Sequence, residues 1–444
     1  MEPAIAEWRS FVDGSDPGNG RDVEALDAHL RDQISGLRAA GLSDDEAFLV
    51  AVTRLARLDR RSQSFARRDR DRLWQPLLTD GDGSATPSED RTPTAAIAFA
   101  VAAAVIVQLA RLAAGFPSNQ PTWLFRNAGL FVLPVLAGWF VHRRGPRRPT
   151  VIAVATAFGV AAVAVNAYPW AAGSGTELLA VTHLPVALWF VVGHAHTGGT
   201  WRSHERRMDF VRFTGEWAIV YALLALGGGV LLGLTAAVLG PAGVDPERIV
   251  EWVLPSGAAG AVIVAAWLAE TRQEVSEHLA PVLTMVFTPM FALMTTVTAV
   301  VYAVTGPVAA FDRDLLGVFD ALLVAVLALV LYGVSARRPS PAPGWTDRMQ
   351  LIAVTAALAL DGMVLAAMAA RIGDLGVTPN RVAALGLNLV LLVGLAVSGW
   401  LTARFVAGRG TLASVERWQT SYLPVFALWA TAVVLVLPPL FRFR

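Results

Sequence analysis

From residue 94 to the end of the chain, long apolar runs alternate with short polar connections. A helix crosses the about 30 Å hydrocarbon core of a bilayer with about twenty apolar residues, and eleven runs reach this length. They cover residues 94–115, 124–142, 150–169, 177–197, 214–240, 249–269, 279–306, 314–336, 349–371, 381–406 and 418–441. The pattern therefore predicts an all-α polytopic integral membrane protein. The composition agrees, because 55% of the residues are hydrophobic and only 16% are charged.

The first 93 residues follow a different pattern. Apolar residues at three- and four-residue spacing form a one-sided helical stripe, which consists of Val23, Leu26, Leu30, Ile34 and Leu37. Ser43 and Glu46 form a capping box that starts a second helix. We predict a cytoplasmic helical module over residues 1–75, a linker over residues 76–93 and a membrane body over residues 94–441. A core this small is marginal alone, so the module is expected to self-associate or dock on a cytoplasmic protein partner.

The distribution of arginine predicts the orientation. The chain has no lysine, so all 36 basic residues are Arg, which is typical of a GC-rich bacterial gene. With the N-terminus inside, the cytoplasmic connections carry 15 Arg and the outside connections seven, as the positive-inside rule requires. The acidic start of the chain does not resemble a signal peptide. We therefore predict a multi-pass protein of the bacterial inner (plasma) membrane, with a cytoplasmic N-terminus and the C-terminus outside.

Eight Arg lie between Arg54 and Arg72, interspersed with Asp59, Asp69 and Asp71. Two interpretations stay open for this segment. It is either a solvated helix end or a contact with anionic lipid, which contributes about 1 kcal/mol per Arg near the surface.

Missing residue types exclude several chemistries. Without Cys there is no disulfide, thiolate metal site or cysteine nucleophile. Without Lys there is neither a Walker A loop nor a Schiff base. His194 and His196 can supply two zinc ligands, but no third ligand follows at a fixed spacing, and His204-Glu205 lacks the second His of an H-E-x-x-H motif. Interfacial histidines are therefore favoured over zinc. We predict no metal site, no cofactor, no catalytic residue and no nucleic-acid partner, which makes an enzyme the least favoured class.

Polar side chains interrupt some of the apolar runs, namely Gln108, Asn166, His183, Asp320, Asp361 and Asn388. Asp361 lies about thirteen residues into its run, past the bilayer midplane, where an ionised carboxylate costs about 2.5–3.5 kcal/mol. Asp320 and Asn388 enter from the outside and can approach Asp361. These three residues are candidates for proton or solute coupling, and a hydrogen-bonded helix clamp is the alternative.

Five further residues are candidates for docking a partner or ligand. Glu216 opens the fifth run shortly after Arg212, where helix capping and an ion pair are the alternative. Arg371, Asp374 and Arg381 lie in the connection between the ninth and tenth runs. Thr378 and Pro379 resemble a helix start, so this connection is either structural or captures a ligand through its two Arg.

Several stretches resemble known families. Asp22-Val23-Glu24-Ala25-Leu26 through His29-Leu30, with residues 40–48, resembles the bacterial permease prefix domain, which often precedes permease-like membrane bodies. Residues 201–216, 314–337 and 371–381 are similar to an uncharacterised multi-pass family, the domain of unknown function numbered 4153. The resemblance implies a helical membrane body in a permease-like or envelope-related setting. It brings no established activity and no catalytic residue.

Two functions follow from these patterns. The first is a permease-like transporter or export component, which rests on the eleven runs and on the polar groups inside them. The second is a membrane signalling or scaffold protein that acts through its cytoplasmic module.

Overall fold

The computed structural model describes residues 5, 8–9, 20–39, 44–55, 93–115, 121–171, 173–239, 245–271, 273–305, 313–337 and 342–444. The chain divides into two compact units, Met1–Glu89 and Asp90–Arg444. Each unit is described by itself below.

The first unit contains α2 (Gly20–Ala39) and α3 (Asp44–Leu55). Leu30 and Ile34 of the predicted stripe are buried, together with Trp8 and Phe48. Part of the apolar face of α2 is therefore covered inside the unit, and the expectation of a partner rests on the small size of the core alone. Ser43 and the Arg-rich segment beyond Arg54 lie outside the described residues.

The second unit has eleven helices that are long and apolar enough to cross a membrane, among its described residues. They are α6 (Pro93–Ala113), α7 (Pro121–Arg144), α8 (Arg148–Ala167), α9 (Gly175–His196), α10 (His204–Leu239), α11 (Pro246–Thr271), α12 (Gln273–Thr305), α13 (Arg313–Ser335), α14 (Trp345–Leu375), α15 (Pro379–Val406) and α16 (Leu412–Leu435). A short helix, α17 (Leu437–Leu440), follows them. The predicted class, an all-α polytopic membrane protein, is confirmed.

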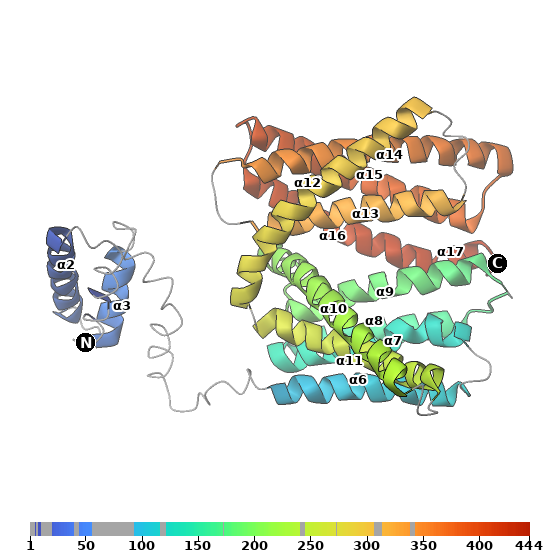
Figure 1. Ribbon diagram of the computed structural model, residues 1–444, viewed down its shortest axis with the longest axis horizontal. Coiled ribbons are helices and arrows are strands. Elements are labelled where there is room, and N and C mark those ends of the chain that lie inside the picture. Colours follow the sequence, from blue (N-terminus) through green and yellow to red (C-terminus); the bar gives the residue numbers. More distant parts are fainter. Residues whose placement is uncertain are drawn as a thin grey trace. The chain divides into compact units, whose positions relative to one another are not determined.

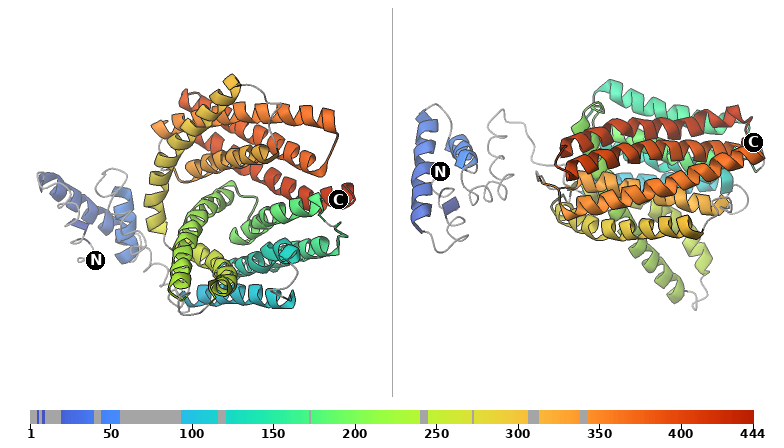
Figure 2. Two further views of the ribbon diagram at one scale, coloured as in Figure 1. Left: turned by 45° about the vertical axis from the view of Figure 1, so that its right-hand side comes forward. Right: turned by 90° about the horizontal axis from the view of Figure 1, so that it is seen from above.

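The helices of the second unit form two groups (Figures 1 and 2). In the first group α6 packs on α7 and α11, and α7 packs on α9. In the second group α14 packs on α12, α13 and α15. The groups meet where α16 packs on both α9 and α15, where α15 reaches α9, and where the slanted α10 of the first group reaches α13.

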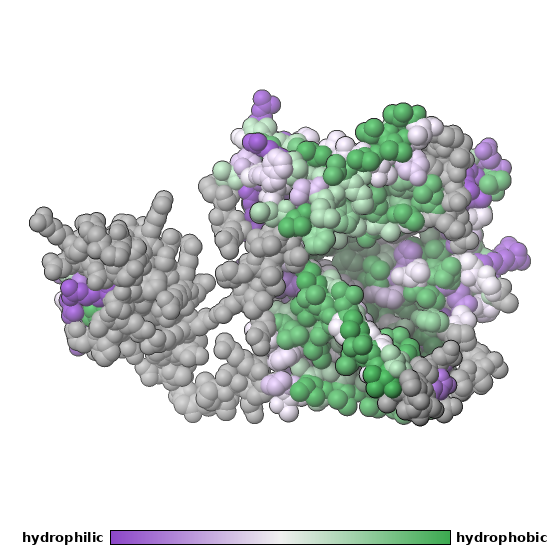
Figure 3. All heavy atoms as spheres, viewed as in Figure 1, coloured by the Kyte–Doolittle hydropathy of each residue, from purple (hydrophilic) through white to green (hydrophobic). Residues whose placement is uncertain are grey.

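The eleven helices alternate in direction, so the second unit has two ends. We call the end where α6 begins the N end, and the end that carries α17 and the C-terminus the C end (Figure 1). Exposed apolar side chains cover much of α10 and α12 between these ends, and the surface is hollowed between α10 and the second group (Figure 3).

Several helices begin earlier than predicted, and the last predicted run is divided. Helix α12 begins at Gln273 rather than 279, and α16 begins at Leu412 rather than 418. The fifth run was expected to begin at 214, but α10 begins at His204 and has 36 residues, which is about 54 Å of helix. Glu216 is therefore well inside α10, and its predicted place in a first helical turn is wrong. Hydropathy marks only the apolar part of a helix that extends beyond the bilayer. The last predicted run divides into α16 and α17, because Pro438 and Pro439 have no backbone N–H to donate.

Glycine permits two close contacts between helices. A Cβ atom at Gly215 of α10 would collide with the Tyr332 ring of α13. A Cβ atom at Gly386 of α15 would collide with the Trp429 ring of α16. Both glycines therefore let an aromatic ring rest directly on the backbone of a neighbouring helix.

Candidate functional site

Asp320, Asp361 and Asn388 gather within the second group of helices. The Asn388 Nδ2 atom donates to Asp320 Oδ1 at 2.8 Å and to the Ala384 carbonyl oxygen at 2.9 Å. The first of these bonds joins α15 to α13. Asp361 comes from α14, and its neighbour Leu360 is buried in the same cluster as Phe319, the residue next to Asp320 in α13. The structure therefore brings together the three residues that interrupt these runs.

Asp361 is the most isolated of the three. It lies near the middle of the 31-residue α14 and is fully buried. Neither carboxyl oxygen has a hydrogen-bond partner among the described residues. Apolar side chains of α13 and α14, including Phe319, Leu360 and Val364, are buried in the same region. A hydrogen-bonded clamp through Asp361 thus has no visible partner group, whereas the bond between Asn388 and Asp320 does join two helices.

The other polar groups inside the runs make structural hydrogen bonds. Asn166 exchanges amide hydrogen bonds with Asn127, at 2.7 Å and 3.1 Å, and joins α8 to α7. Gln108 of α6 donates to Trp252 and Ser256 of α11. The His183 ring bonds the Leu179 carbonyl oxygen of its own helix at 2.9 Å. Helix assembly explains these residues, and it does not explain Asp361.

A second polar site lies at the N end of the first group. It is a cavity of about 310 Å³ lined by both signs of charge, with walls that include Arg144, His196, Arg206, Asp209, Arg212, Glu216 and Glu270. Arg212 donates twice to the Ser335 carbonyl oxygen, through Nε at 2.8 Å and Nη2 at 2.7 Å. Arg212 therefore binds the end of α13, and Glu216 is buried in the same cavity wall.

Glu270 is the centre of this second site and was not among the candidates predicted from the sequence. Arg144 donates to both of its carboxylate oxygens at 3.0 Å, His196 Nε2 lies 2.9 Å from Oε1, and Arg143 lies 3.7 Å away. A carboxylate with these partners ties α7, α9 and α11 together. The one available signal was that Glu270 ends an apolar run at the same end as Arg143 and Arg144.

The connection between α14 and α15 has a structural arrangement. The Arg381 guanidinium donates to the carbonyl oxygens of Leu375 and Gly376, at 2.9 Å and 2.6 Å. Thr378 caps α15, because its side chain accepts from the Arg381 backbone N–H at 3.4 Å. Asp374 is exposed, and Arg371 is half-buried. Arg381 is thus occupied in closing the turn, which weakens the alternative of ligand capture.

The described residues contain no group of three or more His, Asp or Glu side chains that could hold a metal ion. His204 is used differently, since its Nδ1 atom lies 2.8 Å from the Thr420 hydroxyl.

The class that the fold defines is a polytopic helical membrane protein with eleven candidate spans. Compared with protein-family models, curated proteins and solved structures, the chain matches none of them. No family is therefore identified, and function has to be argued from the sites themselves.

Proposed function

We propose that this protein is a permease-like transporter in which protonation of Asp361 is coupled to solute movement. The observation that carries the proposal is a fully buried carboxyl group, near the middle of a spanning helix, whose oxygens have no partner among the described residues. Ionisable groups at such depth are costly, and proteins that keep them commonly use them for proton relays and coupling. Asp320 and Asn388 are the neighbours through which the proton state of Asp361 acts.

The local charge balance favours a proton over a fixed ion pair. Asp320 and Asp361 bring two negative charges to the site when both are ionised, and Asn388 contributes a neutral amide. No Arg or His is hydrogen-bonded to either carboxylate among the described residues. Two carboxylates buried among the same helices disfavour ionisation of both at once. Uptake and release of one proton is the simplest way to relieve the repulsion.

The orientation of the protein in the membrane is part of the same proposal. The N end faces the cytoplasm and the C end faces the outside of the bacterial inner membrane, in agreement with the arginine distribution. No family model matches the chain, so the permease-like setting rests on the resemblance of residues 22–30 and 40–48 to the permease prefix domain and of residues 201–216, 314–337 and 371–381 to the uncharacterised family.

Infrared difference spectroscopy of the full-length protein in lipid nanodiscs tests the titration without knowledge of the solute. A buried protonated carboxyl gives a carbonyl stretch that disappears when the pH is raised. We expect this band in the wild type and in the control Asp374→Asn, and its loss in Asp361→Asn. An unchanged band in Asp361→Asn would assign the titration to another residue and remove the basis of the proposal.

Coupling to movement requires a second measurement. The chain has no Cys, so cysteines introduced at Val230 of α10 and Val297 of α12 can be spin-labelled specifically. Both positions are exposed, and they lie on helices from the two groups. The distance distribution between the labels is expected to change with pH in the wild type and to remain fixed in Asp361→Asn. If the distance distribution between the labels is independent of pH in both the wild type and Asp361→Asn, a coupled transporter is contradicted.

A signalling or scaffold protein remains the second candidate, since the first unit is compact by itself. Deletion of residues 1–75 separates the two functions. A transporter keeps its pH-dependent distance change after the deletion, whereas a signalling protein loses its cellular phenotype while the body still inserts.

A further inference from the structure

A large apolar cavity lies in the first group of helices, at a distance from the acidic residues of α13 and α14. It has a volume of about 760 Å³ and is formed by α6, α7, α9, α10 and α11. This volume falls within the about 300–1,000 Å³ that ligand cavities usually have. Phe125 lines the cavity and is 67% exposed, so the cavity opens on the side of the helix bundle.

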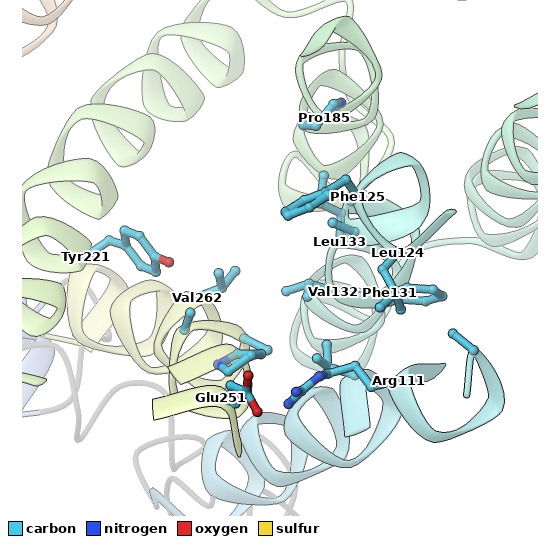
Figure 4. Close-up of a pocket in the computed structure, with 17 residues that line it drawn as sticks. Arg111, Leu124, Phe125, Phe131, Val132, Leu133, Pro185, Tyr221, Glu251 and Val262 are labelled. Carbon is cyan, nitrogen blue, oxygen red and sulfur yellow. The ribbon is translucent and has the colours of Figure 1, made fainter. Parts of the chain in front are cut away.

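Charged side chains are confined to one end of the cavity. Arg111 and Glu251 lie beside each other there, while Val262, Pro185 and Tyr221 line other parts of the wall (Figure 4). The Arg111 guanidinium lies 5.4 Å from the Trp252 ring centroid, and its Nη1 atom donates to Gln108 Oε1 at 3.2 Å. Arg111 is thus held in a fixed position at this end.

The depth of the cavity matches one leaflet of a bilayer. Arg111 is in the last turn of α6 and Glu251 is near the start of α11, so the charged end is close to the membrane surface. From Glu251 to Val262 the wall runs eleven residues along α11, which is about 17 Å. Half of a 30 Å hydrocarbon core is about 15 Å. A lipid in this leaflet would have its head at the charged end and its chains along the apolar wall.

We infer that this cavity binds a zwitterionic phospholipid. Arg111 faces the phosphate, and Glu251 faces the ammonium group of the same head. The presence of both charges favours a zwitterionic head over a purely anionic one, because Glu251 repels an anion that lacks an ammonium group. The site lies in the other group of helices from Asp361, so the inference does not rest on the proposed function.

Native mass spectrometry of the full-length protein tests this inference. The protein is released from nanodiscs that contain equal amounts of phosphatidylethanolamine and phosphatidylglycerol, and the retained lipid is counted. We expect retained phosphatidylethanolamine in the wild type. Ala258→Trp fills the cavity and should lower its occupancy about tenfold, which corresponds to about 1.4 kcal/mol. Val230→Trp is the matched control, because Val230 is exposed on α10 and does not line the cavity.

Glu251→Gln tests the recognition of the head. Glu251 is exposed, so its substitution spares the fold. The preference for phosphatidylethanolamine over phosphatidylglycerol should fall about fivefold, the size of one exposed charge pair. Equal retention in Ala258→Trp and Val230→Trp would overturn the cavity as the binding site. Phosphatidylglycerol retained as well as phosphatidylethanolamine by the wild type would overturn the zwitterionic head.

Discussion

Removal of the two carboxylates at the acidic site should change stability in opposite directions. Asp320 accepts a 2.8 Å hydrogen bond from Asn388 that joins α13 to α15. In Asp320→Leu the buried Asn388 amide loses this acceptor, and its Oδ1 atom already has no partner among the described residues. An unsatisfied buried polar group costs about 1–3 kcal/mol. We therefore expect Asp320→Leu to be destabilised by an amount in this range.

Removal of the Asp361 carboxylate is expected to have the opposite effect on stability. Both of its carboxyl oxygens are buried without a partner in the described part of the chain, so the native state already carries their desolvation cost. Replacement by Leu removes that cost of about 1–3 kcal/mol. The larger Leu side chain offsets part of this stabilisation, because extra volume strains a packed core. Asp361→Leu is expected to be at least as stable as the wild type. Asp361→Asn keeps the shape and should lie within about 1 kcal/mol of it.

Thermal unfolding of the full-length proteins, followed by helical circular dichroism at one fixed detergent concentration, measures this difference. The expected order of midpoints places Asp320→Leu below the wild type and Asp361→Leu at or above it. If Asp361→Leu unfolds at a lower temperature than Asp320→Leu, then Asp361 makes a stabilising hydrogen bond. Asp361 would then be a clamp between helices. The argument that its carboxyl oxygens destabilise the native state because they lack hydrogen-bond partners would be refuted.

Three further predictions concern packing, orientation and the first unit. Gly386→Val should destabilise the protein by about 1–3 kcal/mol, because its side chain would collide with Trp429. The control Gly229→Ala has open space and should be neutral or slightly stabilising in the same thermal assay. Reporter fusions after residue 75 and at Arg444 should report opposite sides of the membrane, and the same side for both would refute the orientation. A purified fragment of residues 1–75 should sediment as more than a monomer or bind the membrane body, and a monomeric, non-binding fragment would exclude docking.

The spans could be predicted from the sequence because the bilayer leaves the backbone few choices. Every backbone N–H and C=O group in hydrocarbon needs an internal partner, so a long apolar run becomes a helix. The same reasoning fails beyond the bilayer surface. Residues 204–213 include six polar or charged side chains, yet they form the first turns of α10. Hydropathy cannot distinguish such a helical extension from a loop, which is why Glu216 was assigned to a helix start.

Only part of the candidate site could be predicted from the sequence. Asp361 stood out because a carboxyl group is conspicuous against an apolar background, and no neighbouring helix was needed to see it. The partners of polar groups depend instead on which helices become neighbours. Gln108 bonds Ser256, 148 residues further along the chain, and Glu270 bonds Arg144 and His196 of two other helices. Sequence spacing contains no information about such pairs.

Coupling between the acidic site and the first group of helices needs a physical connection, and α13 provides one. Asp320 lies in the N-terminal third of α13, toward the C end of the second unit, whereas Tyr332 and Ser335 lie in the last turn of α13, at the N end of the unit. The Tyr332 ring rests on the backbone of α10 at Gly215, and the Ser335 carbonyl oxygen accepts both hydrogen bonds from Arg212. A shift of α13 on protonation of Asp361 would therefore displace α10, which lines both the polar cavity at the N end and the apolar cavity. If the proposed protonation of Asp361 moves α13, we expect the contact at Gly215 and the hydrogen bonds of Arg212 to transmit that movement to α10, because both join the two helices directly.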